Sequence, residues 1–175
     1  MQIDGDLADW KQAQTVPFVH KDLGPAREPV DVTTKVCYDD EWLYYGVQVK
    51  SKHNGITLVV DADADGFYCG NDNWYLEIGA DGKLRNARMH FANKNRWPFF
   101  DDQHEALKPE DLHYAVKTDG DTQQIEIGLP KRPDLGLELK AGKKLGWMMY
   151  ISLPSGSPVA VFEPYSIFDC VLGSK

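Results

Sequence analysis

The stretch VDVTTKVCYDDEWLYYGVQVKSK, residues 30–52, decides the fold class of this chain. In its first half, apolar or β-branched residues alternate with polar ones; the alternating set is Val30, Val32, Thr34, Val36 and Tyr38. After the acidic turn DDE, one face carries Leu43, Tyr45, Val47 and Val49, and the other carries Tyr44, Gln48 and Lys50. A period of two residues is typical of a half-buried β-strand. The stretch therefore predicts two antiparallel strands joined by a tight turn.

The same pattern returns along the rest of the chain. Strand-like runs cover residues 55–63, 73–92, 112–129, 144–153 and 166–173. Asp81-Gly82 and Asp119-Gly120 mark turns inside two of these runs, because Asp-Gly pairs favour the backbone of two-residue hairpin loops. Trp74, Leu76 and Ile78 share one face of the second run, as Ile125, Ile127 and Leu129 do in the third.

Many short strands with Gly and Asp turns, and hardly any helical period, predict an all-β fold. We expect an antiparallel β-sandwich of jelly-roll or immunoglobulin-like two-sheet architecture, formed by one domain over residues 1–175. Two stretches read as loops: the Pro-punctuated residues 20–30, and the long, aromatic residues 93–112. Loops of the second length are uncommon in compact domains and are often functional.

Composition narrows the classes of partner. The chain has 175 residues and a net charge of −8, and its Lys and Arg residues are scattered. This argues against a nucleic-acid or anionic-membrane surface and favours a neutral ligand or a cation. No apolar run is long enough to span a membrane.

The amino-terminal and cysteine patterns leave the compartment open. MQIDGDLADW lacks the basic and apolar regions of a signal peptide, so an extracellular or periplasmic location is favoured only if the chain is an excised or mature module. Cys37, Cys69 and Cys170 lack a CxxC spacing, and both one disulfide and three free thiols fit them.

An acidic loop follows the run 55–63. Asp61, Asp63 and Asp65 stand at alternate positions before Gly66, which matches the first half of a D-x-D-x-D-G calcium loop. Counting on, the carbonyl of Phe67 falls at position 7 and Asp72 at position 12, where a helical calcium loop carries Glu. Three carboxylates held close together repel one another unless a cation binds them. The spacing thus predicts a structural Ca²⁺ site between strands; the alternative is an acidic, solvated turn.

A candidate ligand site lies in the long loop 93–112. Trp97 and Phe99 could stack on the apolar face of a sugar, and Asn95, Arg96 and Asp101 could bind its hydroxyl groups. The alternative use of Trp97 is to anchor the loop.

Catalytic signatures are missing from the sequence. No nucleophile elbow, P-loop or GxGxxG is present, and the five histidines lack metal-site spacing. We therefore expect a non-catalytic chain. A rival hypothesis is a haem b electron-transfer subunit, since sandwiches of similar build hold haem through Met with Lys or His; the candidate ligands are Met89, His90, Met148 and Met149.

Several segments together resemble carbohydrate-binding module family 9-like domains, in the family's order from residue 3 to about residue 168. The segments are IDGDLADW, VCYDDEWLYYGVQVKSK, GNDNWYLEIGADG, IEIGLPKRPDLGLELKAGKKLGWMMYIS and FEPYS. The resemblance implies a β-sandwich, frequent structural calcium, binding of a polysaccharide or oligosaccharide, and attachment of many relatives to larger enzymes or surface proteins. The tryptophan pair that clamps sugar in characterised members cannot be placed here. A structural or interaction domain without sugar binding is the alternative.

Overall fold

The computed structural model of the chain describes residues 1–16, 31–64, 73–91, 103–106, 109–152, 154, 158–160 and 168–174. Within these residues lie twelve strands: β1 (Gln14–Val16), β2 (Asp31–Tyr38), β3 (Trp42–Lys50), β4 (Gly55–Asp61), β5 (Asn73–Gly79), β6 (Leu84–Phe91), β7 (Gln103–Ala106), β8 (His113–Asp119), β9 (Thr122–Pro130), β10 (Lys144–Ser152), β11 (Pro158–Ala160) and β12 (Phe168–Val171). Three 3-10 helices accompany them: η1 (Leu7–Asp9), η2 (Pro109–Asp111) and η3 (Pro133–Leu135). No helix in this part of the chain is long and apolar enough to cross a membrane.

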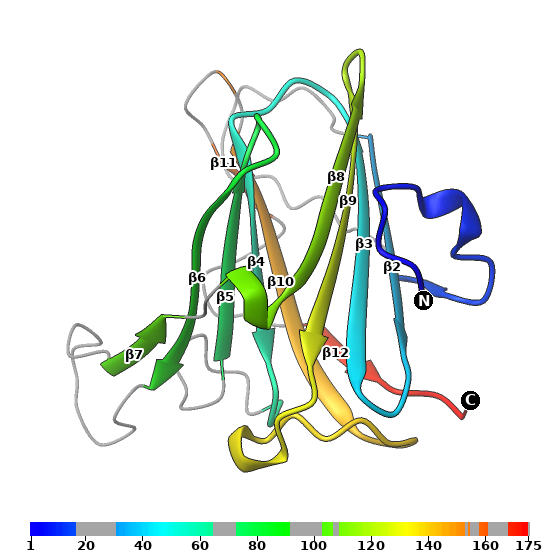
Figure 1. Cartoon of the computed structure of the whole chain (residues 1–175), viewed down its shortest axis with the longest axis vertical. Helices are drawn as coiled ribbons and strands as arrows, with labels where there is room; N and C mark the ends of the chain where they lie inside the picture. Colours follow the sequence, from blue (N-terminus) through cyan, green and yellow to red (C-terminus); the bar gives the residue numbers. More distant parts are fainter. Residues whose placement is uncertain are drawn as a thin grey trace.

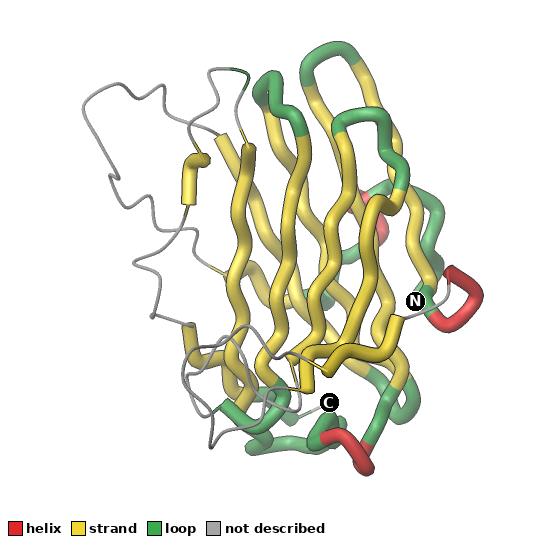
Figure 2. The backbone as a smooth tube through the Cα atoms, turned by 90° about the vertical axis from the view of Figure 1, so that its left-hand side faces the viewer, coloured by secondary structure: helices red, strands yellow, loops and turns green. Residues whose placement is uncertain are grey.

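The strands form two antiparallel sheets. Sheet A has the order β1-β2-β3-β9-β8, and sheet B has the order β11-β10-β4-β5-β6-β7, with β12 also paired to β10. Figure 1 shows β2, β3, β8 and β9 beside β4, β5, β6 and β10, and Figure 2 shows that the strands run along the long axis with their connections at the two ends. The predicted all-β sandwich is confirmed.

The predicted hairpins have the register that their patterns imply. Asp31 to Tyr38 pair with Lys50 to Leu43, which places the apolar set of both strands on one face. In the turn between β5 and β6, Gly82 adopts φ +75°, a conformation that other residues rarely take. The pairing of β5 with β6 shifts by one residue between Glu77, which pairs with Asn86, and Ile78, which pairs with Leu84.

The core lies between the two sheets and consists of the alternating residues of both. Leu43, Val49 and Leu129 of sheet A and Val60 and Trp74 of sheet B are completely buried. The rings of Tyr45 and Trp147 pack across the core with centroids 6.4 Å apart. Burial of these large side chains supplies the main driving force for joining the two sheets.

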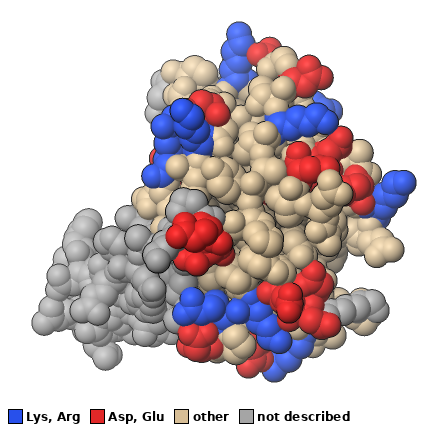
Figure 3. Space-filling view, in the orientation of Figure 1, with Lys and Arg blue, Asp and Glu red and all other residues tan. Residues whose placement is uncertain are grey.

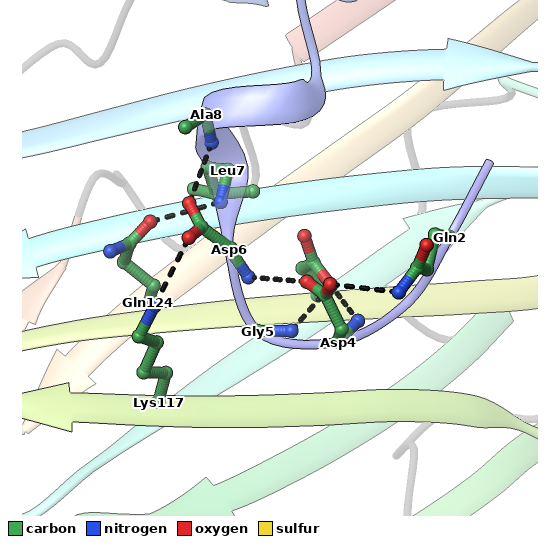
Figure 4. A network of polar contacts seen from close by, with 9 residues as sticks. Gln2, Asp4, Gly5, Asp6, Leu7, Ala8, Lys117 and Gln124 are labelled. Atoms are coloured by element: carbon green, nitrogen blue, oxygen red, sulfur yellow. Dashed lines mark hydrogen bonds and ion pairs between the residues drawn. The ribbon is translucent and has the colours of Figure 1, made fainter.

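The amino-terminal segment lies on the outer face of sheet A. The buried carboxylate of Glu126 on β9 accepts hydrogen bonds from the backbone N–H groups of Asp4 and Gly5, at 2.6 and 2.7 Å. Leu7 N–H donates to the Gln124 side chain, and Lys117 pairs with Asp6 (Figure 4). The segment IDGDLADW is therefore fixed to the sheet by its own backbone.

Gly46 in β3 has no side chain and so leaves room for the amino-terminal segment. A Cβ atom on Gly46 would lie 2.4 Å from Leu7 and 3.1 Å from the ring of Trp10. Trp10 also meets Tyr44 edge-on, with centroids 6.3 Å apart. Leu7, Trp10 and Tyr44 thus form a small second core outside the sandwich.

Some elements differ from the sequence-based expectations. The stretch 93–112, predicted to be a loop, contains β7 and η2, and the short edge strands β1 and β11 were not predicted. Each of these elements has only three or four residues, too few to show a period. Cys37 and Cys170 are free thiols, whereas Cys69 lies outside the described residues.

Candidate functional site

Most of the residues predicted to bind a ligand or a metal lie outside the described part of the chain. These are Asn95, Arg96, Trp97, Phe99 and Asp101 of the aromatic loop, and Asp65, Phe67 and Asp72 of the acidic loop. Their predicted roles stay predictions. Asp61 and Asp63 are described, as are the strands from which both loops depart.

Asp61 ends β4 and is completely buried. Its carboxylate accepts a hydrogen bond of 2.8 Å from the N–H of Ala64, which adopts the left-handed φ of 57°. Across the sheet, Asp61 pairs with Asn73, another completely buried polar residue, while Asp63 is exposed. Among the described residues no group of three potential ligands forms a metal site. The carboxylate thus has at least one defined structural role, which is to hold the first turn of the loop.

The outer face of sheet B carries the other polar groups near these loops. Ile56, Leu58 and Val60 of β4 belong to the core between the sheets. Because successive side chains of a strand point to opposite faces, the residues between them point outward, as do the residues paired with these on β5 and β10. Three rows of outward positions cross β10, β4 and β5 in register: Gly146–Asp61–Asn73, Met148–Val59–Tyr75, and Tyr150–Thr57–Glu77.

Asn86 of β6 extends the third row. It pairs with Glu77 in the ladder between β5 and β6, and both side chains are half-buried. In the part of the chain that the structure describes, neither side chain forms a hydrogen bond or an ion pair. A carboxylate and an amide side by side can together hold two neighbouring hydroxyl groups.

Aromatic and apolar residues occupy other positions in the same row and in the adjacent row. Tyr75 and Tyr150 are half-buried on the same face, whereas Val59 and Met148 are buried at 0% and 1% exposure although they point away from the inner core. We call the face formed by Thr57, Tyr75, Glu77, Asn86 and Tyr150 the polar face of sheet B. Its combination of rings, amide and carboxylate can bind a ligand that has both apolar C–H faces and hydroxyl groups.

None of these five residues was predicted from the sequence to belong to a site. The signal was present in the second run, where Tyr75 and Glu77 alternate with the apolar Trp74, Leu76 and Ile78. Alternation predicts that Tyr75 and Glu77 point outward. It does not predict that β4 and β10 pair beside β5, and this strand order is what brings Thr57 and Tyr150 onto the same face.

The methionines considered as haem ligands are divided between the two sides of sheet B. Met149 belongs to the inner core and is completely buried. Met148 lies on the outer side. The structure places the backbones of Met89 and His90 in β6, opposite Trp74 and Asn73. Met148 and Met149 therefore cannot serve one iron together.

Charge is mixed over the surface in Figure 3, where Lys and Arg side chains alternate with Asp and Glu. This face has no continuous basic patch among the described residues, in agreement with the net charge of −8. A phosphate backbone would find little attraction there.

Comparisons with known proteins give matches among solved structures. No sequence-family model matches the chain, and no curated protein matches it either. A family 9 carbohydrate-binding module from Caldicellulosiruptor kristjanssonii in complex with cellotriose aligns with 100% of this chain and 90% of its own, at a TM-score of 0.68 and 13% identity. The glucose complex from the same organism aligns with 100% of this chain and 92% of its own, at a TM-score of 0.68 and 12% identity.

A Bacteroides uniformis protein proposed to bind carbohydrate is a further match. It aligns with 95% of this chain and 82% of its own, at a TM-score of 0.56 and 10% identity. At these identities the likeness concerns the fold. The resemblance seen in the sequence is thus confirmed at that level: this chain has the β-sandwich fold found in carbohydrate-binding module family 9.

Proposed function

We propose that the chain is a non-catalytic carbohydrate-binding module that binds a neutral glycan on the polar face of sheet B. The observation that carries the proposal is the full-length likeness to a family 9 module in complex with cellotriose. The uncommitted pair of Glu77 and Asn86 supplies the hydrogen-bonding groups that such a ligand needs, with Tyr75 in the adjacent row and Tyr150 two strands from Glu77 in the same row.

Sugar rings present C–H faces that pack on aromatic side chains, while their hydroxyl groups both donate and accept hydrogen bonds. Glu77 can accept from two hydroxyl groups, and Asn86 can accept from one and donate to another. Because these side chains stand on paired strands, their spacing is set before the ligand arrives, which reduces the entropy lost on binding.

Among the described residues of this face, the placement of carboxylates supports binding rather than glycoside hydrolysis. Asp61 lies opposite Asn73, four residues along β5 from Glu77. Four strand residues span about 13 Å, whereas glycosidases hold their two carboxyl groups within about 10 Å of each other. The carboxylate of Asp61 is also engaged by the N–H of Ala64.

We expect Glu77→Ala and Asn86→Ala each to weaken cellotriose binding by about tenfold, because each removes one or two hydrogen bonds of about 1 kcal/mol. Isothermal titration calorimetry with cellotriose and glucose provides the measurement. Gln48→Ala is the matched control, since Gln48 is a half-buried strand amide without a side-chain partner among the described residues. If the wild-type chain gives no heat with either sugar, or if both variants bind as the wild type does, the assignment of this face is wrong.

A glycan array separates this function from that of a structural or interaction domain. We expect the wild-type chain to retain neutral glycans, and binding should be compared with and without calcium. A chain that retains no glycan in either condition would be a structural or interaction domain.

We also propose that the acidic loop binds a structural Ca²⁺ through Asp61, Asp63, Asp65 and Asp72 and the carbonyl of Phe67. The donors are all oxygen atoms, which suits a hard cation. Asp61 and Asn73 bring two buried oxygen-bearing side chains to the base of the loop, which further supports the proposal. A bound cation would fix the connection between β4 and β5 beside the polar face.

We expect calcium to raise the melting temperature of the chain and EDTA to lower it by about 5–10 °C. A ligand at one hundred times its Kd stabilises a fold by about 2.7 kcal/mol, and each kcal/mol shifts the midpoint by about 2–4 °C at this chain length. Asp63→Asn should reduce the shift, whereas Asp119→Asn, on the exposed end of β8, should not. Absence of both calcium heat and an EDTA effect would exclude the site.

A further inference from the structure

A groove lies at the edge of sheet A, away from the polar face of sheet B. It has a volume of about 410 Å³ and is lined by Gln12 and Gln14, by the end of β2 with Tyr38 and Asp39, by Tyr44, and by residues 170–174. Both ends of the chain lie on the β2 side of the molecule (Figure 1). Ligand pockets in proteins have volumes of about 300–1,000 Å³, so the groove has room for a mono- or disaccharide.

Hydrogen bonds between its walls hold the groove in shape. The hydroxyl of Tyr44 donates to Asp39 at 2.7 Å, and the hydroxyl of Tyr38 donates to the carbonyl of Gly173 at 2.5 Å. The other oxygen of Asp39 accepts from the N–H groups of Glu41 and Trp42, at 2.9 and 2.8 Å. These bonds connect the turn between β2 and β3 to Tyr44 of β3, and Gly173, near the carboxyl terminus, to Tyr38 of β2.

Two amides in the groove are uncommitted. Gln12 and Gln14 are exposed, and neither side chain has a hydrogen-bond partner in the described part of the chain. Both amides donate and accept, and the hydroxyl oxygen of Tyr44 keeps acceptor capacity after donating its proton to Asp39. The aromatic rings and Val36 add apolar surface to the same groove.

Charge selects the class of ligand. Among the described residues that line the groove, Asp39 has the only charged side chain, and the terminal ammonium group of Met1 supplies the opposite charge. Partial burial opposes ionisation of Asp39, but the hydrogen bonds from Glu41, Tyr44 and Trp42 outweigh this and hold its pKa below the usual range. The amino-terminal ammonium group of Met1, which also lines the groove, lowers this pKa further. The groove thus sets one carboxylate against one ammonium group, so its net charge is small and it suits a neutral ligand whose hydroxyl groups donate to the carboxylate.

We propose that this groove is a second ligand site, for a neutral hydroxylated ligand of disaccharide size or smaller, with Gln12 and Gln14 as its hydrogen-bonding side chains. The site depends on no residue of the polar face of sheet B. With both sites occupied by one polysaccharide, the module would gain affinity through two-point attachment.

Two thiols report on the groove directly. Cys37 and Cys170 both line it, and both are free and half-buried. Burial raises the pKa of the Cys37 thiol to about 11 and also raises that of Cys170, so alkylation is slow enough to follow. Peptide mass spectrometry measures iodoacetamide labelling at each cysteine, with glucose, cellobiose or glucuronate as the probe.

We expect glucose or cellobiose at ten times its Kd to slow labelling of Cys37 and Cys170 by about tenfold. The double variant Gln12→Ala/Gln14→Ala should weaken this protection by about tenfold. Glu77→Ala, on the other face, should leave it unchanged. Thr15→Ala is the matched control, because Thr15 is exposed on the same strand as Gln14 but does not line the groove.

Three outcomes would overturn the proposal. The first is labelling of the wild type that neither neutral sugar slows. The second is protection that Glu77→Ala removes and Gln12→Ala/Gln14→Ala keeps, which would assign the effect to sheet B. The third is protection by glucuronate without protection by the neutral sugars. Because calorimetry on Glu77→Ala and Asn86→Ala tests the polar face separately, failure of one site is distinguishable from failure of the other.

Discussion

Glu126→Ala is expected to lower the free energy of unfolding by about 2–4 kcal/mol, because it removes a buried acceptor from two backbone N–H groups at once. The carboxylate holds Asp4 and Gly5 at 2.6 and 2.7 Å, and these two bonds fix the turn that leads to Leu7 and Trp10. Without them, the amino-terminal segment should leave the outer face of sheet A. Urea unfolding measures the loss, and hydrogen exchange at Asp4 and Gly5 locates it.

Glu126→Gln is the matched variant, because Asp4 and Gly5 both donate to one carboxylate oxygen, Oε2, and the amide oxygen of Gln can take its place. Burial raises the pKa of Glu126 above its ordinary value of 4.5, although the N–H groups of Gly5 and Asp4 and the contact with Trp10 act against this. The folded state therefore binds the proton more tightly than the unfolded state does. The contribution of this group to stability is present below its ordinary pKa and is lost as the pH rises through the raised pKa.

The wild-type chain should accordingly lose stability relative to Glu126→Gln as the pH rises through that window. Unchanged urea midpoints in Glu126→Ala, together with unchanged exchange at Asp4 and Gly5, would show that the segment is held by Leu7 and Trp10 alone.

The strands of the sandwich were predictable because their chemistry is local. The stretch 30–52 has the period, the turn and the aromatic content of a hairpin, and it forms β2 and β3 with the expected register. Asp81-Gly82 likewise marks the turn between β5 and β6. In each case the alternation lies within one short run, and the turn joins two runs that are neighbours in the sequence.

The candidate site was not predictable in the same way, because it combines residues from strands that are distant in sequence. Tyr150 meets Thr57 and Glu77 only because β10 pairs with β4, and no period in either segment reveals that pairing. Glu126 shows a similar limit. In the run Ile125, Glu126, Ile127 it reads as an exposed residue, yet the amino-terminal segment covers it and buries it completely.

Trp147→Ala is expected to lower the free energy of unfolding by about 3–5 kcal/mol, the usual cost of deleting a large buried aromatic ring. Trp147 is 2% exposed on β10 of sheet B, and its ring meets that of Tyr45 on β3 of sheet A. Removal of the ring leaves a cavity between the sheets that neighbouring core residues can fill only in part. Trp147→Phe should cost about 1–2 kcal/mol, because it keeps most of the apolar contact.

Cellotriose titrations at low temperature, where the variant stays folded, separate packing from recognition. Met148, the next residue along β10, lies on the outer side of sheet B, so Trp147 supports the polar face from beneath without touching a ligand there. We expect Trp147→Ala to lose stability while keeping affinity within about threefold, a difference of less than 1 kcal/mol. If Trp147→Ala unfolds at the same urea concentration as the wild type, the core has repacked to fill the space left by the ring. If the variant stays folded but loses cellotriose binding, Trp147 is one of the residues that position the site.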